Sequence, residues 1–293
     1  NAHLFDDYVE HVLSFIDVSA IRSYRLVLDA GNGMAGLIAP SLFERFPCQI
    51  TRLCCEIDGT FPNHDANPLI EENRQDIVDQ VVTDCADAGI AWDGDADRCF
   101  FIDGDGEFVP GDFVTALLAE AFLRKHPGAK IVYDVRASNV VKDTAQACGG
   151  SALMNRVGHA FFKDRMRKEN AVFGGEVTGH YYFRNNFYAD NGLIPALIIL
   201  ELMSVKGRTL SELLAPLRKK YFISGEINTP MPDMSSVHRI LDELAHRYSN
   251  GHVYMMDGVS VEFPTWHFNV RPSNTEPLLR LNLEAKSGDL MAE

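Results

Sequence analysis

Apolar residues along most of the chain form two alternating patterns. Continuous apolar runs, such as residues 26–28 and 90–92, are typical of strands that are buried on both faces. Between such runs, apolar residues recur at helical spacing, as in residues 5–16 and 77–85. Because buried strands and amphipathic helices alternate along the chain, the pattern predicts an α/β architecture.

The same pattern divides the chain into three units. The first, residues 1–107, ends in a predicted hairpin, and the second, residues 108–221, repeats the α/β plan. In the last unit, residues 222–293, one helical stretch precedes segments in which apolar and polar residues alternate. That alternation predicts antiparallel strands with one solvated face. We therefore expect two similar α/β domains with mixed sheets, followed by a smaller α+β domain with an antiparallel sheet.

Composition narrows the class of protein. With 293 residues, 46% of them hydrophobic, the chain is long enough for two or three domains. No apolar run approaches the ~20 residues of a membrane span, and no signal peptide opens the sequence. The six cysteines lack metal-type spacing and are interpreted as thiols in a reducing, cytoplasmic compartment. A net charge of −14 disfavours nucleic acid and anionic membranes as partners, so an anionic small molecule would need a local basic pocket.

One short acidic stretch carries the strongest chemical signal. Asp93, Asp95 and Asp97 alternate along it, so in an extended loop all three carboxylates can turn toward one point. Three like charges repel unless a cation lies between them, and oxygen-only ligands select a hard ion such as Mg²⁺. Arg98 follows directly and can bind a phosphate beside that ion. A metal and an arginine in one loop suit phosphoryl transfer, in which charge spreads over phosphate oxygens.

Two simpler interpretations of the acidic stretch compete with a metal site. An EF-hand beginning at Asp93 is excluded, because its sixth position is Arg98 rather than glycine and its twelfth is Gly104 rather than glutamate. A solvated acidic turn stays open, since most Asp-Gly clusters are turns.

A glycine-rich stretch, residues 175–180, offers groups that suit a sugar. Glu176 and Thr178 can point the same way from an extended strand end, where a carboxylate and a hydroxyl can bridge neighbouring sugar hydroxyls. His180, together with His159, is a candidate for proton transfer or phosphate contact. The competing interpretation is a glycine-rich turn whose histidine is satisfied in a core.

Residues 271–277 form a predicted loop between two strands of the last unit. The loop gathers a guanidinium, two hydroxyls and an amide, from Arg271, Ser273, Thr275 and Asn274. That mixture can hold a phosphate. An ordinary Pro-Ser-Asn turn is the competing interpretation.

Another motif points to a different class of protein. Gly31, Gly33 and Gly36 formally match the dinucleotide-binding fingerprint, and Glu56 follows at about the 20-residue spacing that the fingerprint requires. A dinucleotide-binding oxidoreductase would leave the acidic stretch and both later loops unexplained, so it ranks far below a phosphoryl-transfer protein.

Taken together, three stretches resemble the α-D-phosphohexomutase superfamily, in its bacterial phosphomannomutase/phosphoglucomutase branch. Residues 93–98, 175–180 and 271–277 are similar, in this order, to the metal, sugar and phosphate loops of that family. The resemblance runs over essentially the whole chain. Further family-typical stretches are similar to residues 29–36, 62–68 and 157–159.

The resemblance implies roles for the residues at matching positions. The Mg²⁺ ligands would be Asp93, Asp95 and Asp97. The residues around the transferred phosphoryl group would be Arg98, Arg136 and His159, with His180 as a possible acid or base. The substrate-binding residues would be Glu176 and Thr178 on the sugar hydroxyls, and Arg271, Ser273, Asn274 and Thr275 on the phosphate that is not transferred.

The resemblance also implies an activity. Members of the family interconvert hexose 6-phosphate and hexose 1-phosphate through a hexose 1,6-bisphosphate, and mannose is the expected sugar here, with glucose second. In the family a serine of a first domain carries the phosphoryl group, and no stretch of this sequence resembles that serine loop. We therefore expect domains two, three and four of such an enzyme, inactive on their own. A non-catalytic fragment that binds Mg²⁺ and sugar phosphates is the alternative, and the sequence leaves the oligomeric state open.

Overall fold

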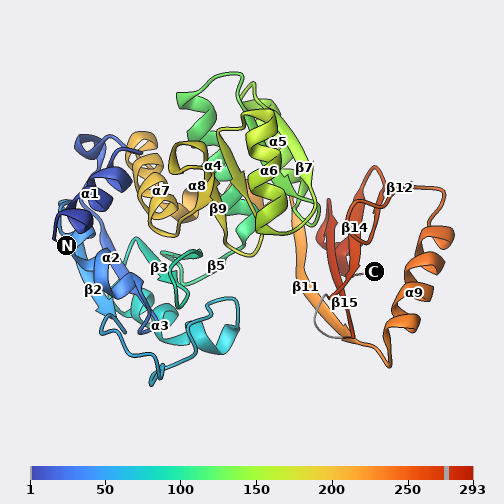
Figure 1. The fold of residues 1–293 in the computed structure, drawn as a ribbon, viewed down its shortest axis with the longest axis horizontal. Helices are drawn as coiled ribbons and strands as arrows, with labels where there is room; N and C mark the ends of the chain where they lie inside the picture. The colour runs from blue at the N-terminus through green and yellow to red at the C-terminus, as the bar shows by residue number, and fades with distance from the viewer. Residues whose placement is uncertain (1, 274–276, 293) are drawn as a thin grey trace.

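Three five-stranded sheets follow one another along the chain (Figure 1). The computed structural model describes residues 2–273 and 277–292. The first two sheets combine parallel and antiparallel strand pairs, whereas every pair in the third is antiparallel. The predicted fold class, two α/β units followed by an α+β unit, is therefore confirmed.

The first unit builds a sheet in the order β2-β1-β3-β4-β5. Its elements are α1 (Ala2–Leu13), a 3-10 helix (Val18–Ala20), β1 (Arg25–Asp29), α2 (Ala35–Phe43), β2 (Gln49–Leu53), a second 3-10 helix (Glu71–Arg74), α3 (Gln75–Thr83), β3 (Ala88–Trp92), β4 (Cys99–Asp103) and β5 (Phe108–Val109). Alternate residues of β1 pack toward α2 and toward α3, so the central strand is apolar on both faces. The predicted hairpin is β4 with β5.

The second unit builds a sheet in the order β10-β9-β8-β6-β7. Its elements are α4 (Gly111–Lys125), β6 (Lys130–Asp134), α5 (Asn139–Ala147), β7 (Ser151–Asn155), α6 (His159–Glu169), β8 (Phe173–Gly175), β9 (Tyr181–Phe183), a 3-10 helix (Arg184–Asn186), β10 (Ala189–Asp190), α7 (Leu193–Lys206) and α8 (Leu210–Arg218). Ser138 caps α5, since its hydroxyl accepts a hydrogen bond from the backbone N–H of Val140.

A single hydrophobic cluster runs through both α/β units. It joins residues of α1, α2 and β3 to residues of α4 and α7. α7 is buried along most of its length because α1, β4 and the first 3-10 helix of the first unit and α4 of the second unit pack against it. Trp92, at the end of β3, is fully buried and donates an indole hydrogen bond of 2.8 Å to the carbonyl of Gly192. The two α/β units therefore pack as one body.

The last unit has a hydrophobic cluster of its own. Its sheet has the order β11-β15-β14-β13-β12, and α9 packs against one face. The elements are β11 (Phe222–Pro230), α9 (Met234–Arg247), β12 (His252–Tyr254), β13 (Val259–Glu262), β14 (Trp266–Pro272), β15 (Leu278–Ala285) and α10 (Gly288–Ala292). The sequence did not predict β11, because this edge strand is largely exposed and lacks an apolar alternation.

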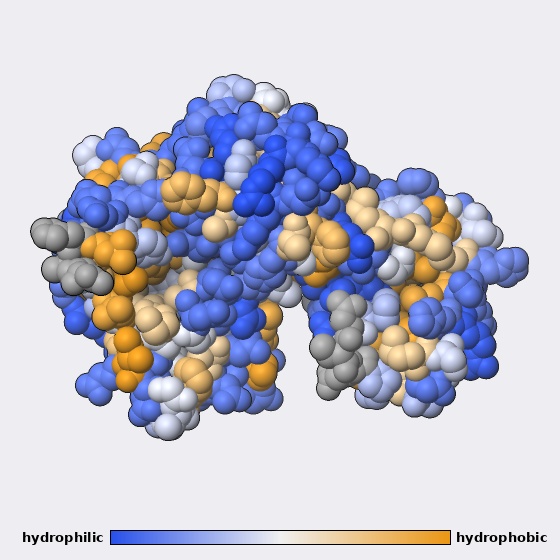
Figure 2. All heavy atoms as spheres, in the orientation of Figure 1, coloured by the Kyte–Doolittle hydropathy of each residue, from blue (hydrophilic) through white to orange (hydrophobic). Residues whose placement is uncertain are grey.

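Polar contacts join the last unit to the second. Glu284 accepts hydrogen bonds from the Ser138 hydroxyl and from the backbone N–H of Asn139, and the Asn139 amide lies 2.9 Å from His267 Nδ1. Elsewhere, the backbone N–H of Val157 donates to Asp257 over 3.0 Å. Figure 2 shows the surface hollowed between the first and last units.

A close backbone approach sets the position of the acidic loop. The backbone N–H of Met34 donates to the carbonyl of Gly94 over 2.9 Å. A Cβ atom on Gly33 would lie 2.5 Å from that same carbonyl oxygen, so only glycine fits there without displacing the loop. The glycine-rich stretch after β1 thus supports the loop after β3.

We expect Gly33→Ala to destabilise the fold by roughly 1–3 kcal/mol, the usual cost of overpacking a tight site. Gly59→Ala is the matched control, since a Cβ at Gly59 would meet no atom within 4 Å. Urea unfolding followed by circular dichroism measures both variants. Equal midpoints for the two variants would show that Gly33 is not needed for this backbone approach.

A buried histidine–aspartate pair braces the end of β1. His64 Nε2 lies 3.1 Å from Asp29 Oδ2, and His64 Nδ1 lies 3.0 Å from the carbonyl of Asp65. The hydrogen bond to Asp29 raises the pKa of His64 to about 9, although partial burial opposes the charged form. In an unfolded chain a histidine titrates near pH 6.5.

The raised pKa of His64 makes stability pH-dependent. Because the folded state holds this proton more tightly, the His64 contribution is fully present below about pH 6.5 and is lost as pH rises through about 9. We expect the free energy of unfolding to fall across that window, and to fall less in His64→Gln. Urea unfolding at several pH values tests this. If the two proteins show the same slope against pH, the pair does not carry the linkage.

Candidate functional site

The three aspartates of the acidic loop gather at one point. Asp93 is buried, Asp97 is half-buried and Asp95 is exposed, and one carboxylate oxygen from each lies within 4.8 Å of the others. Burial, together with the charges of Asp93 and Asp95, raises the pKa of Asp97 to about 6 against the opposing charge of His180. Converging carboxylates that disfavour one another's charge fit a hard divalent cation.

Arg98 holds the acidic loop in shape. Its backbone N–H donates to Asp93 Oδ1 over 3.0 Å, and its Nε donates to Asp93 Oδ2 over 2.7 Å. Its Nη1 lies 3.4 Å from the side-chain oxygen of Asn67, a residue that sequence reasoning did not single out. The guanidinium is therefore oriented by an aspartate of the loop.

The glycine-rich loop lies directly beside the acidic loop. The backbone N–H of Cys99 donates to the carbonyl of Gly179 over 3.1 Å, and Arg98 forms an isolated bridge with His180. Residues 176–179 form a tight turn between β8 and β9, rather than the extended strand end that the sequence suggested. Two predicted sites, far apart in sequence, are thereby in contact.

Within this turn, Glu176 is buried and Thr178 is half-buried. Glu176 accepts a hydrogen bond of 2.7 Å from the Tyr182 hydroxyl. Burial raises the pKa of Glu176, and the charge of Asp134 adds to the effect. The Glu176 carboxylate is thus held in one orientation. The turn, not an extended strand, sets the directions of the Glu176 and Thr178 side chains.

Arg136 is a buried cation between the second and last units. It forms a bidentate pair with Asp134, with its Nη2 2.9 Å from Oδ2, and lies 3.8 Å from Glu176. Its Nη1 lies 3.5 Å from Glu226 of β11. Burial opposes the charged form, but Asp134, with Glu176 and Glu226, outweighs this effect and raises the pKa of the guanidinium above its usual value. Since Arg136 is engaged by three carboxylates, it connects the glycine-rich loop to β11.

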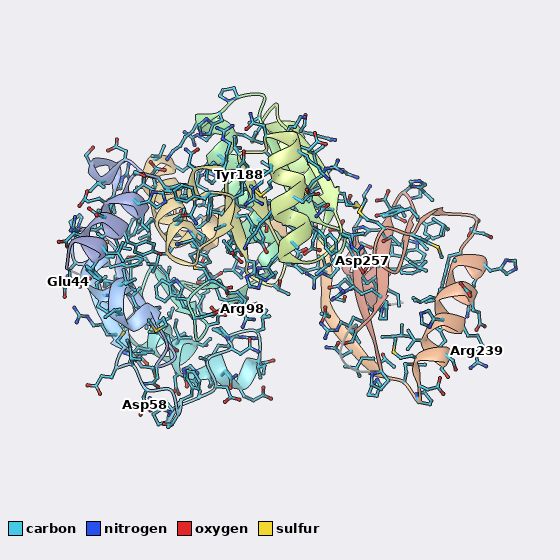
Figure 3. The ribbon with its side chains drawn as sticks, viewed as in Figure 1. Glu44, Asp58, Arg98, Tyr188, Arg239 and Asp257 are labelled. Carbon is cyan, nitrogen blue, oxygen red and sulfur yellow. The ribbon has the colours of Figure 1, made fainter. Side chains whose placement is uncertain are left out.

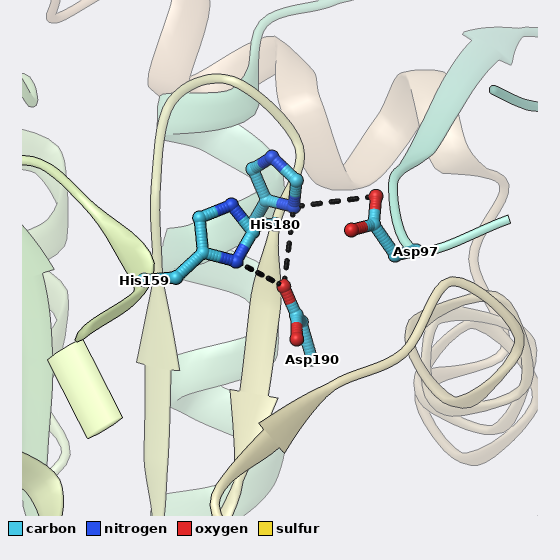
Figure 4. Close-up of side chains that lie close together, drawn as sticks. All are labelled: Asp97, His159, His180 and Asp190. Carbon is cyan, nitrogen blue, oxygen red and sulfur yellow. Dashed lines mark ion pairs between the residues drawn. The ribbon is translucent and has the colours of Figure 1, made fainter. Parts of the chain in front are cut away.

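Two histidines meet around one aspartate (Figure 4). Asp190 Oδ2 lies 2.8 Å from His159 Nδ1 and 3.4 Å from His180 Nδ1. Asp97 Oδ1 reaches His180 Nδ1 from the other side at 3.5 Å. Sequence reasoning missed Asp190, because an Asp-Asn-Gly segment in front of a helix is typical of a turn.

The first residue of the predicted phosphate loop, Arg271, is paired with a second arginine, Arg280. Arg271 and Arg280 face each other on β14 and β15, and Arg271 lies 3.8 Å from Asp257. Burial lowers the pKa of Arg271, and repulsion from Arg136 adds to this. Ser273 is buried and accepts a hydrogen bond of 3.3 Å from Arg280. Asn274 and Thr275 lie outside the described residues.

A line of charged contacts connects the two ends of the site. Arg136 contacts Glu176 on one side and Glu226 on the other, and Glu226 lies 3.3 Å from Arg280. In Figure 3 Arg98 lies on the side of the first unit toward the hollow, and Asp257 lies where the last unit meets the second. The arrangement can hold a cation at one end and an anion at the other.

The glycine-rich stretch that matches the dinucleotide fingerprint does not form an open phosphate-binding loop. Side-chain space at Gly33 is taken by the backbone of Gly94, and at Gly36 by the carbonyl of Cys55. Both glycines therefore accommodate protein backbone, not the approach of a pyrophosphate. Within residues 2–273 and 277–292, no helix is long and apolar enough to cross a membrane.

Comparison with known families matches almost all of the chain. Residues 6–106 match the phosphoglucomutase/phosphomannomutase alpha/beta/alpha domain II, residues 110–221 match its alpha/beta/alpha domain III, and residues 226–293 match its C-terminal domain.

Individual relatives agree with the family match. A protein of Xanthomonas campestris described as a phosphohexose mutase is 44% identical over 98% of this chain and 64% of its own length. A phosphomannomutase of Vibrio cholerae is 45% identical over 97% of this chain and 62% of its own length. The chain thus spans less than two thirds of these curated relatives.

A solved structure shows the same fold. A phosphoglucomutase/phosphomannomutase family protein of Burkholderia thailandensis superimposes with a TM-score of 0.88 at 33% identity, and the match covers 99% of this chain and 62% of that one. On the family matches, the relatives and this shared fold, the chain belongs to the phosphoglucomutase/phosphomannomutase family.

Proposed function

We propose that these residues form the metal, sugar and phosphate sites of a phosphohexomutase, which interconverts hexose 6-phosphate and hexose 1-phosphate through a hexose 1,6-bisphosphate. Mannose is the proposed sugar, with glucose second, because curated relatives at 42–45% identity are named phosphomannomutases. The observation that carries the proposal is the series of contacts that runs from Asp97 through His180 and Glu176 to Arg136, Glu226 and Arg280.

The first part of the proposal concerns the transferred phosphoryl group. Asp93, Asp95 and Asp97 would hold Mg²⁺, which neutralises charge on phosphoryl oxygens as it develops. Arg98 lies beside these carboxylates and would bind the same phosphoryl group. The fixed pairing of Arg98 with Asp93 keeps its guanidinium oriented before any ligand arrives, which lowers the cost of binding.

The second part concerns the sugar. Glu176 and Thr178 would hold neighbouring hydroxyls, and the hydrogen bond from Tyr182 fixes the Glu176 carboxylate. His180 and His159 would contact the phosphoryl group or move a proton, and both face Asp190. Arg136 supports this side of the site through its contact with Glu176.

The third part concerns the phosphate that stays in place. Arg271 and Ser273, with Asn274 and Thr275 from outside the described residues, would bind it. Arg280 faces Arg271, so an anion between the two guanidinium groups would relieve their mutual repulsion.

The proposed metal, sugar and phosphate sites belong to three proposed domains, at residues 1–107, 108–221 and 222–293. These residues would supply binding and metal sites, while the serine that donates the phosphoryl group would come from outside them, so that alone they bind without turnover. A purely binding role for Mg²⁺ and sugar phosphates is the second candidate, since each described site is a binding site.

We expect Asp95→Asn to weaken Mg²⁺ binding at least about tenfold while the fold stays intact, because Asp95 is exposed and its change removes one of three ligand charges. Asp105→Asn is the matched control, an equally exposed aspartate at the tip of the β4–β5 hairpin. Isothermal titration calorimetry measures both. Unchanged Mg²⁺ affinity in Asp95→Asn would contradict the metal assignment.

We expect Arg271→Ala to weaken hexose 1-phosphate and hexose 6-phosphate by similar factors, because either end of a bisphosphate that turns over must occupy the same site. A charge-assisted contact contributes roughly 1.5–3 kcal/mol, or about tenfold or more in affinity. Arg239→Ala, an exposed arginine of α9 seen in Figure 3, is the control. Loss of affinity for one isomer alone would argue against a shared phosphate site.

A further inference from the structure

Four side chains from four separate segments converge where the first two units meet. Asp97 comes from the acidic loop, His159 from the start of α6, His180 from the turn before β9 and Asp190 from β10. One ligand atom from each lies within 4.8 Å of the others. Figure 4 shows the two imidazole rings and the two carboxylates facing a common point.

Two separations within this cluster are longer than ordinary hydrogen bonds and match the spacing of metal ligands. His180 Nδ1 lies 3.4 Å from Asp190 Oδ2 and 3.5 Å from Asp97 Oδ1, whereas N–H···O bonds are usually about 2.7–3.2 Å long. Zinc–nitrogen and zinc–oxygen bonds of about 2.1 Å put tetrahedral ligand atoms about 3.4 Å apart. The pair from His159 to Asp190, at 2.8 Å, is the one that would have to open.

Two of the ligand atoms lack a hydrogen bond although they are shielded from water. Within the described residues, His180 Nδ1 and Asp190 Oδ2 are buried and have no hydrogen bond of acceptable geometry. The Asp190 side chain is only 9% exposed. Lys163 Nζ lies 3.1 Å from Asp190 Oδ1, which turns Oδ2 toward the histidines. This is how an outer partner orients a ligating carboxylate.

We propose that Asp97, His159, His180 and Asp190 form a second divalent-cation site that takes Zn²⁺ or a similar borderline ion. Two imidazole nitrogens and two carboxylate oxygens match the ligands that zinc prefers, whereas Mg²⁺ prefers oxygen alone. Two carboxylate charges balance the ion, with both imidazoles neutral. The His159 side chain is 45% exposed, which leaves an entry path from solvent.

An occupied zinc site would oppose the proposed mutase function. Zinc would engage both histidines and one carboxylate of the acidic loop, Asp97, so it would compete with Mg²⁺ and with the sugar phosphate. This consequence rests on the function proposed above, whereas the binding of zinc does not. The site therefore predicts inhibition by Zn²⁺ of any activity that uses His159 or His180.

Cobalt is the direct probe, because tetrahedral Co²⁺ absorbs visible light far more strongly than Co²⁺ in a six-coordinate, all-oxygen site. The purified protein is titrated with Co²⁺ in the absence of sugar phosphate, and Zn²⁺ affinity is then measured by displacement. We expect a tetrahedral spectrum in the unaltered protein. His159→Gln and Asp190→Asn should each lose that spectrum and weaken Zn²⁺ at least about tenfold, since even outer-sphere changes cost 10–100-fold.

Two controls separate this site from the three-aspartate site. Asp95→Asn removes a ligand of the acidic loop but none of the four, so its tetrahedral spectrum and Zn²⁺ affinity should stay within about twofold. His252→Gln removes an exposed imidazole elsewhere and should change neither. Zinc affinity unchanged in both His159→Gln and Asp190→Asn, or a tetrahedral spectrum lost in Asp95→Asn, would overturn the proposal. Either result leaves the Mg²⁺ and sugar-phosphate tests standing.

Discussion

The acidic loop packs between the backbones of two glycines, Gly33 and Gly192, and the position of the rest of the site depends on this packing. Gly33 packs against Gly94 on one side of the loop. On the other side, a Cβ on Gly192 would lie 2.6 Å from the carbonyl of Ala96 and 2.8 Å from that of Arg98. Gly192 belongs to the second unit and also accepts the indole hydrogen bond of Trp92. The position of the carboxylates is therefore set by both α/β units at once.

Different forces hold the two ends of the site. The acidic loop and the glycine-rich turn rest on one continuous apolar cluster, which makes their mutual position insensitive to any single polar contact. The arginine pair belongs to a unit with a separate cluster, which meets the rest of the protein through Ile223 of β11 and through polar contacts such as Arg136–Glu226. Net hydrogen-bond and ion-pair contributions are small compared with core burial. The distance between the two ends therefore depends more on polar contacts than the position of the acidic loop does.

Periodicity in the sequence was enough for the fold class but not for every strand. Long helices such as α4 and α9, and buried strands such as β1, follow directly from apolar spacing. β9 and β10 were missed because two- and three-residue strands carry no period, and β11 because it is an exposed edge. The short strands mattered, since β10 carries Asp190. The extended geometry expected for Glu176 and Thr178 was also wrong, because flanking glycines permit a turn as readily as a strand.

Charge explains what the sequence could and could not reveal about the site. Asp93, Asp95 and Asp97 are close together in the sequence, so their mutual repulsion can be inferred from the sequence alone. The pairing of Arg271 with Arg280 and of Glu226 with Arg280 depends on strand register, and the pairing of Glu226 with Arg136 depends on the packing of the last unit against the second. None of these pairs has a sequence signature. Carboxylates gather at one end of the site and guanidinium groups at the other. The like charges at each end repel one another until a ligand of opposite charge binds. Because the chain has a net charge of −14, an anion is favoured at the arginine end. Once a cation is bound at the carboxylate end, that end can attract a second anionic group. Under the proposed function, a sugar that carries phosphate at both ends would satisfy both ends at once, which is the physical reason for proposing a bisphosphate over a singly phosphorylated ligand.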